Sequence, residues 1–181
     1  MSPWKLAVVV PLWLGVGIAP AQHSKPAPDV LRRPGETTVI SFVTASGKTA
    51  SLCEGAKHAY LVYRFGNAAK TELQYPAVLD ASSWQKFTYL HYERGGGYRN
   101  AGMEDYQLSF RNGGAKYTLT DHTEAYLTKA KNEDYRREVG LDVVLNQRPL
   151  AITVRQASVN GSLYLSDEQR ELVRLEEDEE K

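Results

Sequence analysis

The residues best suited to bind a ligand form one short segment, Arg94-Gly95-Gly96-Gly97-Tyr98-Arg99-Asn100. Glycine loses much backbone entropy on folding, so a run of three favours a place where the backbone approaches another group closely. Successive backbone N–H groups at such a turn can form a concave anion site, and the flanking arginines suit carboxylate, phosphate or sugar groups. We therefore predict that Arg94–Asn100 binds a ligand. A hairpin loop that binds nothing explains the same pattern.

A catalytic interpretation centres on Cys53, the single cysteine, with one of the four histidines as its base. Such catalysis needs a thiolate beside a histidine, usually at an electropositive turn or helix start. Cys53 instead follows Leu52 in a short apolar run, which predicts a small buried side chain. The histidines are scattered, at positions 23, 58, 91 and 122, without the spacing that seats a metal. We predict no metal site and no cofactor.

Carboxylates near the ends of predicted strands offer a second route to hydrolysis. They lie at Glu93, at Glu104-Asp105, and at Asp121 with Glu124. Acid–base catalysis needs two carboxyl groups held in different environments, and the sequence shows no such pair. We predict that the chain is not an enzyme. A cell-envelope hydrolase that uses a carboxylate, or Cys53 with a histidine, is the alternative.

The first 21 residues have the pattern of a signal peptide. Lys5 precedes an almost wholly apolar run from Leu6 to Ile18, and Ala19-Pro20-Ala21 supplies the small residues that signal peptidase accepts. The apolar run is short for a transmembrane helix. We predict cleavage after Ala21, a periplasmic or secreted protein that begins at Gln22, and no stable membrane span after cleavage. A retained membrane anchor is the alternative.

Charge and composition exclude several classes of protein. The 22 basic and 22 acidic residues balance, which removes the basic footprint of a nucleic-acid binder. Residues 22–165 carry 18 basic and 14 acidic groups, whereas residues 166–181 carry 3 basic and 8 acidic groups. A single cysteine cannot form an intramolecular disulfide, so an apolar core must stabilise the exported domain.

The spacing of apolar residues predicts a mostly β domain over residues 36–165. Residues 22–35 hold three prolines and form a predicted extended linker. Beyond Glu36, apolar and polar residues alternate in about eight short runs, of which Val139, Leu141, Val143 and Leu145 make the clearest stripe. Asn112-Gly113 between two such runs is a strong hairpin signal. The pattern predicts an antiparallel sandwich or a small barrel of about eight strands.

Residues 166–181 have the pattern of a short helix followed by an acidic tail. Ser166 is a favourable N-cap, and Gln169 stands three residues later, which is the spacing of a capping box. Asp167 and Glu168 suit the positive end of the helix dipole. We predict a helix from Asp167 to about Glu177, with Leu172 and Leu175 packed on the domain.

Several segments between Cys53 and Asp121 resemble, in their order, a family of small exported proteins of Gram-negative bacteria that has no assigned activity. They are Cys53-Glu54, the segment Tyr60 to Gly66 (YLVYRFG), Glu72 to Pro76 (ELQYP), Phe87-Thr88-Tyr89, Tyr92, Arg94 to Gly97 (RGGG), Asn100-Ala101-Gly102 and Phe110 to Gly113 (FRNG). The resemblance implies a periplasmic or secreted location. It brings no catalytic residue with it, and the chain after Asp121 matches less clearly.

These observations together favour an exported, non-enzymatic β domain that binds a protein or an envelope glycan through its loops. The expectation of a loop-borne site follows from the Arg94–Asn100 segment and from tyrosines near it, because tyrosines beside arginines are common in interfaces. The envelope hydrolase described above and a purely structural envelope component are the alternatives.

Overall fold

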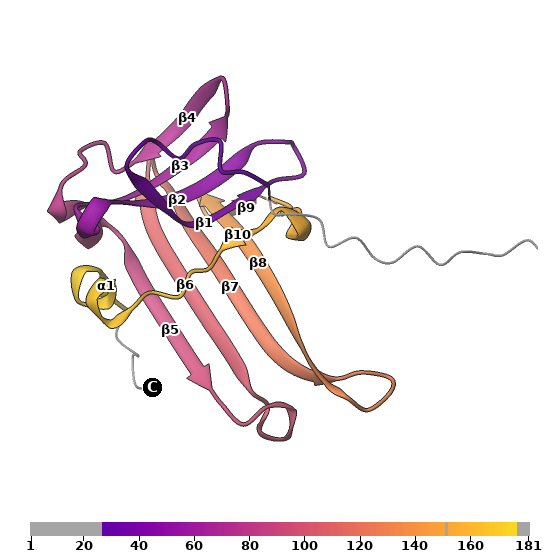
Figure 1. The fold of residues 1–181 in the computed structure, drawn as a ribbon. Coiled ribbons are helices and arrows are strands. Elements are labelled where there is room, and N and C mark those ends of the chain that lie inside the picture. Colours follow the sequence, from indigo (N-terminus) through magenta and orange to yellow (C-terminus); the bar gives the residue numbers. More distant parts are fainter. Residues whose placement is uncertain (1–26, 151, 177–181) are drawn as a thin grey trace, which may run out of the picture.

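The computed structural model describes residues 27–150 and 152–176, and this part of the chain is mostly β. Its eleven described strands form two separate sheets, which pack face to face at one end (Figure 1). The prediction of a mostly β domain is confirmed. The sequence left open whether the sheets form a sandwich or a barrel, and the structure is sandwich-like because the two sheets do not join into a closed ring.

The first sheet has five strands in the order β10-β1-β2-β3-β4, and all its neighbouring strands are antiparallel. Alternating side chains of β1, β2 and β3 point into the space between the sheets, as the sequence pattern requires. The bounds of its strands are β1 Glu36–Val43, β2 Thr49–Gly55, β3 Leu61–Asn67, β4 Lys70–Tyr75 and β10 Asn160–Gly161.

The second sheet has six strands in the order β11-β5-β6-β7-β8-β9. All its pairs are antiparallel except β11, which runs parallel to β5. Asn112 pairs with Ala115 across a two-glycine turn, so the hairpin predicted at Asn112-Gly113 is present. The bounds are β5 Thr88–Arg94, β6 Met103–Asn112, β7 Ala115–Leu127, β8 Glu133–Leu145, β9 Arg148–Leu150 and β11 Arg174–Leu175.

The core lies between the two sheets and is rich in aromatic rings. Phe110 is at its centre and contacts four other rings, those of Tyr63, Tyr75, Phe87 and Tyr117, at centroid distances of 4.5–5.5 Å. Aromatic pairs in this range add stability beyond the area that they bury. Four short 3₁₀ helices border the sheets, at Ala56–His58, Ala81–Lys86, Tyr98–Asn100 and Gln156–Ser158.

The long strands β5–β8 run well past the first sheet and form a projecting end (Figure 1). We use this name for residues 91–106 and 121–138, which include the β5–β6 loop and the β7–β8 turn. Many side chains of this end are exposed, and all those from Glu133 to Glu138 are. The sheet therefore supplies a stiff support for whatever its two tips contact.

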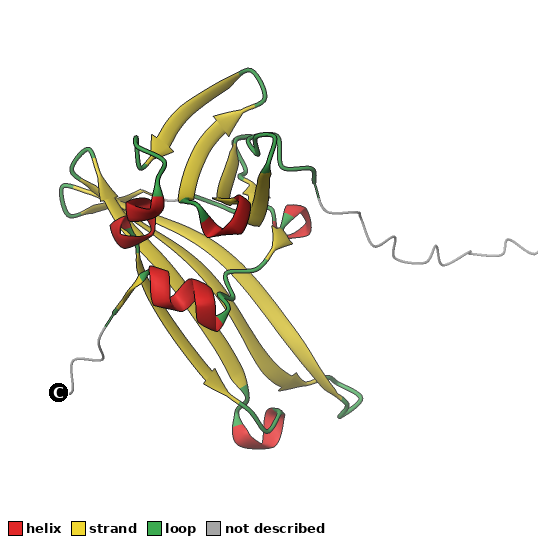
Figure 2. Ribbon diagram, turned by 60° about the vertical axis from the view of Figure 1, so that its left-hand side comes forward, coloured by secondary structure: helices red, strands yellow, loops and turns green. Residues whose placement is uncertain are grey.

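The helix near the C-terminus is shorter than predicted. Helix α1 spans Asp167–Leu172, and its predicted capping box is present, because Ser166 and Gln169 exchange hydrogen bonds. The helix does not continue to Glu177. Val173 leaves helical geometry and is buried, and β11 then pairs with the free edge of β5 (Figure 2). The burial of Val173 and the hydrogen bonds between β11 and β5 thus outweigh the helical preference of the glutamates that follow.

The folded part begins before Glu36, within the segment predicted to be a linker. Leu31 is buried, and the Asp29 carboxylate accepts hydrogen bonds from Thr38 Oγ1 (2.8 Å) and Ser51 Oγ (2.6 Å). Residues 29–35 therefore cover the outer face of the first sheet instead of leading freely into it. The predicted signal peptide and the first part of the linker lie outside the described residues.

Candidate ligand-binding site

The predicted ligand-binding segment connects β5 to β6 at the tip of the projecting end (Figure 1). Its seven residues, Arg94–Asn100, therefore lie together, as their continuity in the chain requires. Gly96 and Gly97 adopt positive φ angles of 95° and 59°, a region that favours glycine. Two of the three glycines are thus needed for the path of the backbone.

Two of the predicted binding side chains hold the loop in its own conformation. Arg94 Nε donates to the carbonyl oxygen of Ala101 (2.9 Å), and Asn100 Nδ2 donates to that of Gly95 (2.7 Å). The backbone N–H of Gly102 also donates to the Gly97 carbonyl (2.7 Å). The loop is therefore an ordered turn, and the contacts of Arg94 and Asn100 are structural ones.

The anion expected at the glycine turn is supplied by the chain itself. The backbone N–H of Tyr98 donates to Glu133 Oε2 (2.9 Å), and a Cβ on Gly97 would lie only 2.5 Å from that carboxylate. Glu133 opens β8 and comes from the neighbouring tip. Sequence reasoning missed it because it is 35 residues away from Tyr98, and only the β6–β7–β8 pairing brings the two together.

Three exposed tyrosines lie among the many charged side chains of the projecting end. Tyr92, Tyr98 and Tyr135 expose 48%, 45% and 58% of their surface, and Arg99 is exposed beside them. Tyrosine and arginine are enriched where proteins bind partners, because they offer a large apolar area together with a polar group. The ordered loop thus presents Tyr98 and Arg99 outward, with Tyr92 on β5 and Tyr135 on β8.

Cys53 is buried in β2, as the sequence predicts. Its Sγ lies 3.2 Å from Ser51 Oγ and 3.5 Å from Asp29 Oδ2, within the polar cluster under residues 29–35. Burial, together with the nearby Asp29 and Glu36 carboxylates, raises the pKa of the Cys53 thiol to about 12. The thiol is therefore protonated at neutral pH and is a poor nucleophile.

The described histidines have partners other than Cys53. His58 Nδ1 lies 2.8 Å from Glu54 Oε2, and His122 Nδ1 lies 3.7 Å from Asp105 Oδ1. The ring of His91 stacks on Tyr89. Among the described residues, no Cys53–histidine contact is formed, so the thiol and the imidazole of the hydrolase interpretation are not assembled here.

We expect slow labelling of Cys53 by a thiol reagent in the native protein and fast labelling after denaturation. We also expect Cys53→Ser to cost about 1 kcal/mol or less, because Ser51 and Asp29 give the new hydroxyl hydrogen-bond partners; a buried hydroxyl without them would cost about 1–3 kcal/mol. Labelling is followed by mass spectrometry, and stability by urea unfolding. Native labelling as fast as that of a denatured sample would contradict a structural role.

Asp121 is a buried structural carboxylate. It accepts hydrogen bonds from Arg137 Nε (2.6 Å) and Nη2 (2.8 Å), from Ser162 Oγ (2.9 Å) and from the backbone N–H of Leu163 (2.9 Å). Burial acts to raise the pKa of Asp121, but these hydrogen bonds outweigh it and hold the pKa below its usual value. Asp121 therefore ties the segment after β10 to the second sheet.

The other carboxylates considered for catalysis lie on the projecting end. Glu93 accepts a hydrogen bond from the buried Tyr106 hydroxyl (3.1 Å), and Glu124 forms an ion pair with Arg136. Burial, aided by Glu93, raises the pKa of Tyr106. Glu93 stands directly opposite Glu104 across β5 and β6. Glu93 and Glu124 each have a partner of their own, a hydroxyl and a guanidinium.

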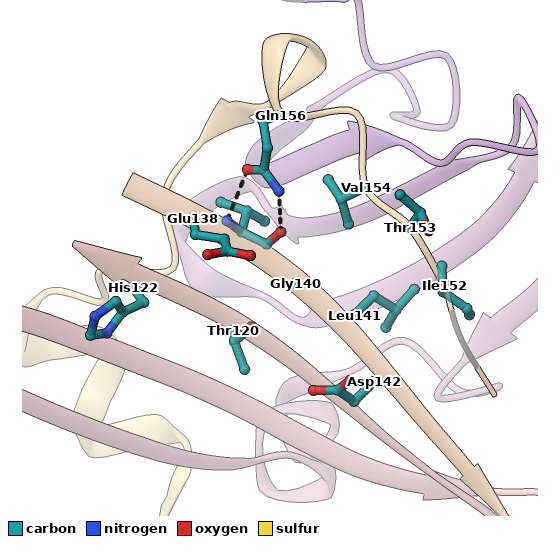
Figure 3. A pocket seen from close by; sticks show the side chains of 11 residues that line it. Thr120, His122, Glu138, Gly140, Leu141, Asp142, Ile152, Thr153, Val154 and Gln156 are labelled. Atoms are coloured by element: carbon teal, nitrogen blue, oxygen red, sulfur yellow. Dashed lines mark hydrogen bonds between the residues drawn. The ribbon is translucent and has the colours of Figure 1, made fainter. Parts of the chain in front are cut away.

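A polar groove of about 600 Å³ runs beside β8 (Figure 3). Gln156 closes one side, because its carboxamide accepts from the backbone N–H of Val139 (3.0 Å) and donates to its carbonyl (2.7 Å). The remaining polar lining comes from β7, β8 and the segment after β9, namely Thr120, His122, Glu138, Asp142 and Thr153. Sequence reasoning missed this groove, because its two walls are far apart in the chain.

The two carboxylate residues of the groove are widely spaced along β8. Glu138 and Asp142 are four residues apart on one strand, which separates their Cα atoms by about 13 Å. Catalytic carboxyl pairs of glycoside hydrolases stand about 5–9.5 Å apart. Gly140 lies between the two, where a Cβ would come within 2.4 Å of Thr120 Oγ1. The groove thus offers contacts for a polar ligand.

A separate apolar hollow of about 340 Å³ opens between β3–β4 and β7–β9, lined chiefly by Tyr63, Phe65, Tyr117, Leu141 and Leu150. The hydroxyl of Tyr63 is the one buried side-chain polar atom in the described chain without a hydrogen-bond partner. Its burial raises the pKa of Tyr63. The hollow marks the open edge of the sandwich.

No group of three or more histidine, cysteine, aspartate or glutamate side chains among the described residues could hold a metal ion. Of the helices in the same residues, none has the length and apolar character needed to cross a membrane.

Comparison with known proteins found no significant match to this chain. The resemblance to small exported proteins of Gram-negative bacteria therefore stays a prediction from the motifs. No protein-family model matches the sequence, and neither a curated protein nor a solved structure matches it significantly.

Proposed function

We propose that this chain is an exported, non-enzymatic binding domain, active in the periplasm or outside the cell, that engages a protein partner through the tip of its projecting end. The observation that carries the proposal is the ordered β5–β6 loop. Glu133 holds the backbone of this loop from the neighbouring tip, and Tyr98 and Arg99 face outward. A loop whose backbone is already held in one conformation loses little backbone entropy on binding, which favours an interface.

The surroundings of the catalytic candidates support a non-enzymatic role. Cys53 is buried among Ser51 and Asp29, and Asp121 is engaged by Arg137. A nucleophile or general acid needs access to a substrate, and these two groups have structural partners instead. The export part of the proposal rests on residues 1–21, which lie outside the described residues.

An envelope glycan is the second candidate partner, and the groove beside β8 favours it. A chain of sugars offers many hydroxyl groups. The groove has a volume of about 600 Å³, and its polar lining includes Thr120, Glu138, Asp142 and Thr153. Polar groups at fixed positions along such a groove would orient a sugar chain. The two candidates use different surfaces, so variants can separate them.

We expect Tyr98→Ala/Arg99→Ala to weaken binding to the partner by about 2 kcal/mol or more, because exposed tyrosine and arginine anchors dominate many interfaces. We expect unchanged thermal unfolding, since neither side chain is buried. The partner is captured from envelope extract with wild-type protein, and the affinity of each variant for the purified partner is then measured.

Matched variants distinguish a binding role from a structural one. Arg148→Ala removes an exposed arginine of β9 at the other end of the sheet and should bind as wild type does. Arg94→Ala removes the hydrogen bond to Ala101 and tests the order of the loop. Equal affinity of the Tyr98/Arg99 variant would contradict the protein interface. If the protein co-sediments with purified peptidoglycan, and Glu138→Gln/Asp142→Asn abolishes this, the result would instead favour the glycan. Absence of a partner in both assays would favour a structural role.

A further inference from the structure

Another pocket lies at the opposite end of the six-stranded sheet from the Arg94–Asn100 loop, and four cationic side chains line it. We call it the basic pocket and define it by Lys86, Arg111, Lys116 and Arg174. It has a volume of about 270 Å³, and Glu176 is the one carboxylate in its lining. The hydroxyl-bearing residues Thr88 and Ser109 lie among the cations. No sequence motif marks this set, because it comes from four separate parts of the chain.

Strand pairing explains why these residues meet. Arg111 stands directly opposite Lys116 in the β6–β7 hairpin, and Thr88 stands opposite Ser109 in the β5–β6 pair. On the other side of β5, Arg174 of β11 pairs with Thr88. Residues paired across strands project on the same face of a sheet, so Arg111, Lys116 and Arg174 share one face with the two hydroxyls. Lys86 ends the 3₁₀ helix before β5 and joins this array in the lining of the pocket.

This array is costly for the protein alone. Like charges directly opposite each other in a sheet destabilise it, and Arg111 faces Lys116. None of the ion pairs formed within residues 27–150 and 152–176 includes any of the four cations. Arg174 Nη2 instead donates to Thr88 Oγ1 (3.0 Å), which fixes the guanidinium at the edge of the pocket. An anion placed among the four would relieve their repulsion.

We infer that the basic pocket binds a small phosphate ester. Four cations against one carboxylate leave more positive charge than a single carboxylate ligand would neutralise, whereas a phosphate carries up to two negative charges. Arginine pairs with phosphate through two parallel N–H donors, and hydroxyls such as those of Thr88 and Ser109 can donate to the remaining oxygens. The volume leaves room for the phosphate and a small polar substituent. This site is independent of the proposed partner surface.

Binding of glycerol 3-phosphate to the whole mature protein tests the inference, with glycerol and acetate as uncharged and monoanionic controls. We expect Arg111→Gln/Lys116→Gln to weaken glycerol 3-phosphate binding at least tenfold in calorimetric titration. The control Lys129→Gln/Arg148→Gln removes the same charge from exposed positions outside the pocket and should change the affinity less than twofold.

A stability measurement separates ligand binding from a structural role. Saturating glycerol 3-phosphate should raise the melting temperature of wild type and of the control by mass action, but not that of Arg111→Gln/Lys116→Gln. Without ligand, this variant should melt at the same temperature as wild type or higher, because the like-charge pair is gone. A lower melting temperature with unchanged affinity would assign the two cations a structural role and overturn the inference.

Three further results would overturn it in favour of another occupant. Acetate binding as tight as glycerol 3-phosphate binding would remove the preference for phosphate. Variant-sensitive binding to phosphatidylglycerol vesicles without binding of glycerol 3-phosphate would assign the pocket to a lipid headgroup. The third test neutralises the acidic residues that follow Glu176, with Glu177→Gln, Asp178→Asn, Glu179→Gln and Glu180→Gln. Binding of glycerol 3-phosphate by this variant alone, with none by wild type, would show that the chain's own tail is the occupant of the pocket.

Discussion

Arg64→Met is expected to lower the free energy of unfolding by about 3–5 kcal/mol, because it leaves a buried carboxylate without its cation. Arg64 Nη1 and Nη2 lie 2.7 Å and 2.8 Å from the two oxygens of Glu36, and both side chains are buried. Tyr60 Oη and the backbone N–H of Arg33 also donate to Glu36. These two donors alone cannot neutralise its charge.

Urea unfolding of Arg64→Met, Glu36→Leu and the double variant measures this pair. The double variant should be more stable than the sum of the two single losses predicts, since it removes both charges together. Arg148→Met is the matched control at an exposed arginine and should change stability by no more than about 0.5 kcal/mol. If Arg64→Met loses no more stability than the control, the buried Glu36 carboxylate does not need a cationic partner.

Asp121→Asn is expected to cost about 3 kcal/mol at neutral pH and to make the protein less sensitive to acid. The change removes charge from a group that accepts four hydrogen bonds, and bonds to charged groups contribute about 1.5–3 kcal/mol each in the most favourable cases. The pKa of Asp121 is lowered in the folded state. Its stabilisation is thus fully present above the unfolded-state value of about 3.9, and it is lost as the pH falls through the lower folded-state pKa.

The pH dependence of urea unfolding between neutral pH and acid checks this expectation. Wild type should lose stability steeply below about pH 4, and Glu36, whose pKa is also lowered, should contribute to the same loss. Asp121→Asn should show a shallower decline. Asp142→Asn, at an exposed carboxylate, serves as control. Parallel curves for wild type and Asp121→Asn would contradict a stabilising, ionised Asp121.

Those parts of the fold that depend on local pattern could be predicted from the sequence. Alternation from Val139 to Leu145 locates the inner half of β8, because Val139, Leu141 and Val143 are buried in the core, although Leu145 is exposed. The same strand begins earlier, at Glu133, and no alternation marks its first residues. Both faces of β8 meet solvent from Glu133 to Glu138, so an apolar stripe is not required there. The capping box of Ser166 and Gln169 is similarly local, whereas the end of α1 depends on the pairing of β11 with β5.

The candidate sites follow the same division. Arg94–Asn100 is continuous in sequence and could be chosen by composition alone. Glu133, which binds the Tyr98 N–H, could not, since its role depends on the register of β7 and β8. The basic pocket likewise requires Arg174 to return beside β5. The partners of a single charged residue cannot be predicted from the sequence before the strand order is known.

The Gln156 carboxamide that closes the groove also bears on aggregation. Strand β9 pairs only with residues 143–145 of β8. Within the described chain, the rest of β8 therefore has β7 on one side and no strand on the other. An open edge can recruit a strand from another molecule and start a growing assembly. Gln156 occupies both backbone groups of Val139, and the neighbouring positions hold charged side chains, Glu133, Asp134, Arg136, Arg137 and Glu138. An incoming strand would have to displace the carboxamide and bury these charges, so a single side chain helps to keep the protein from polymerising.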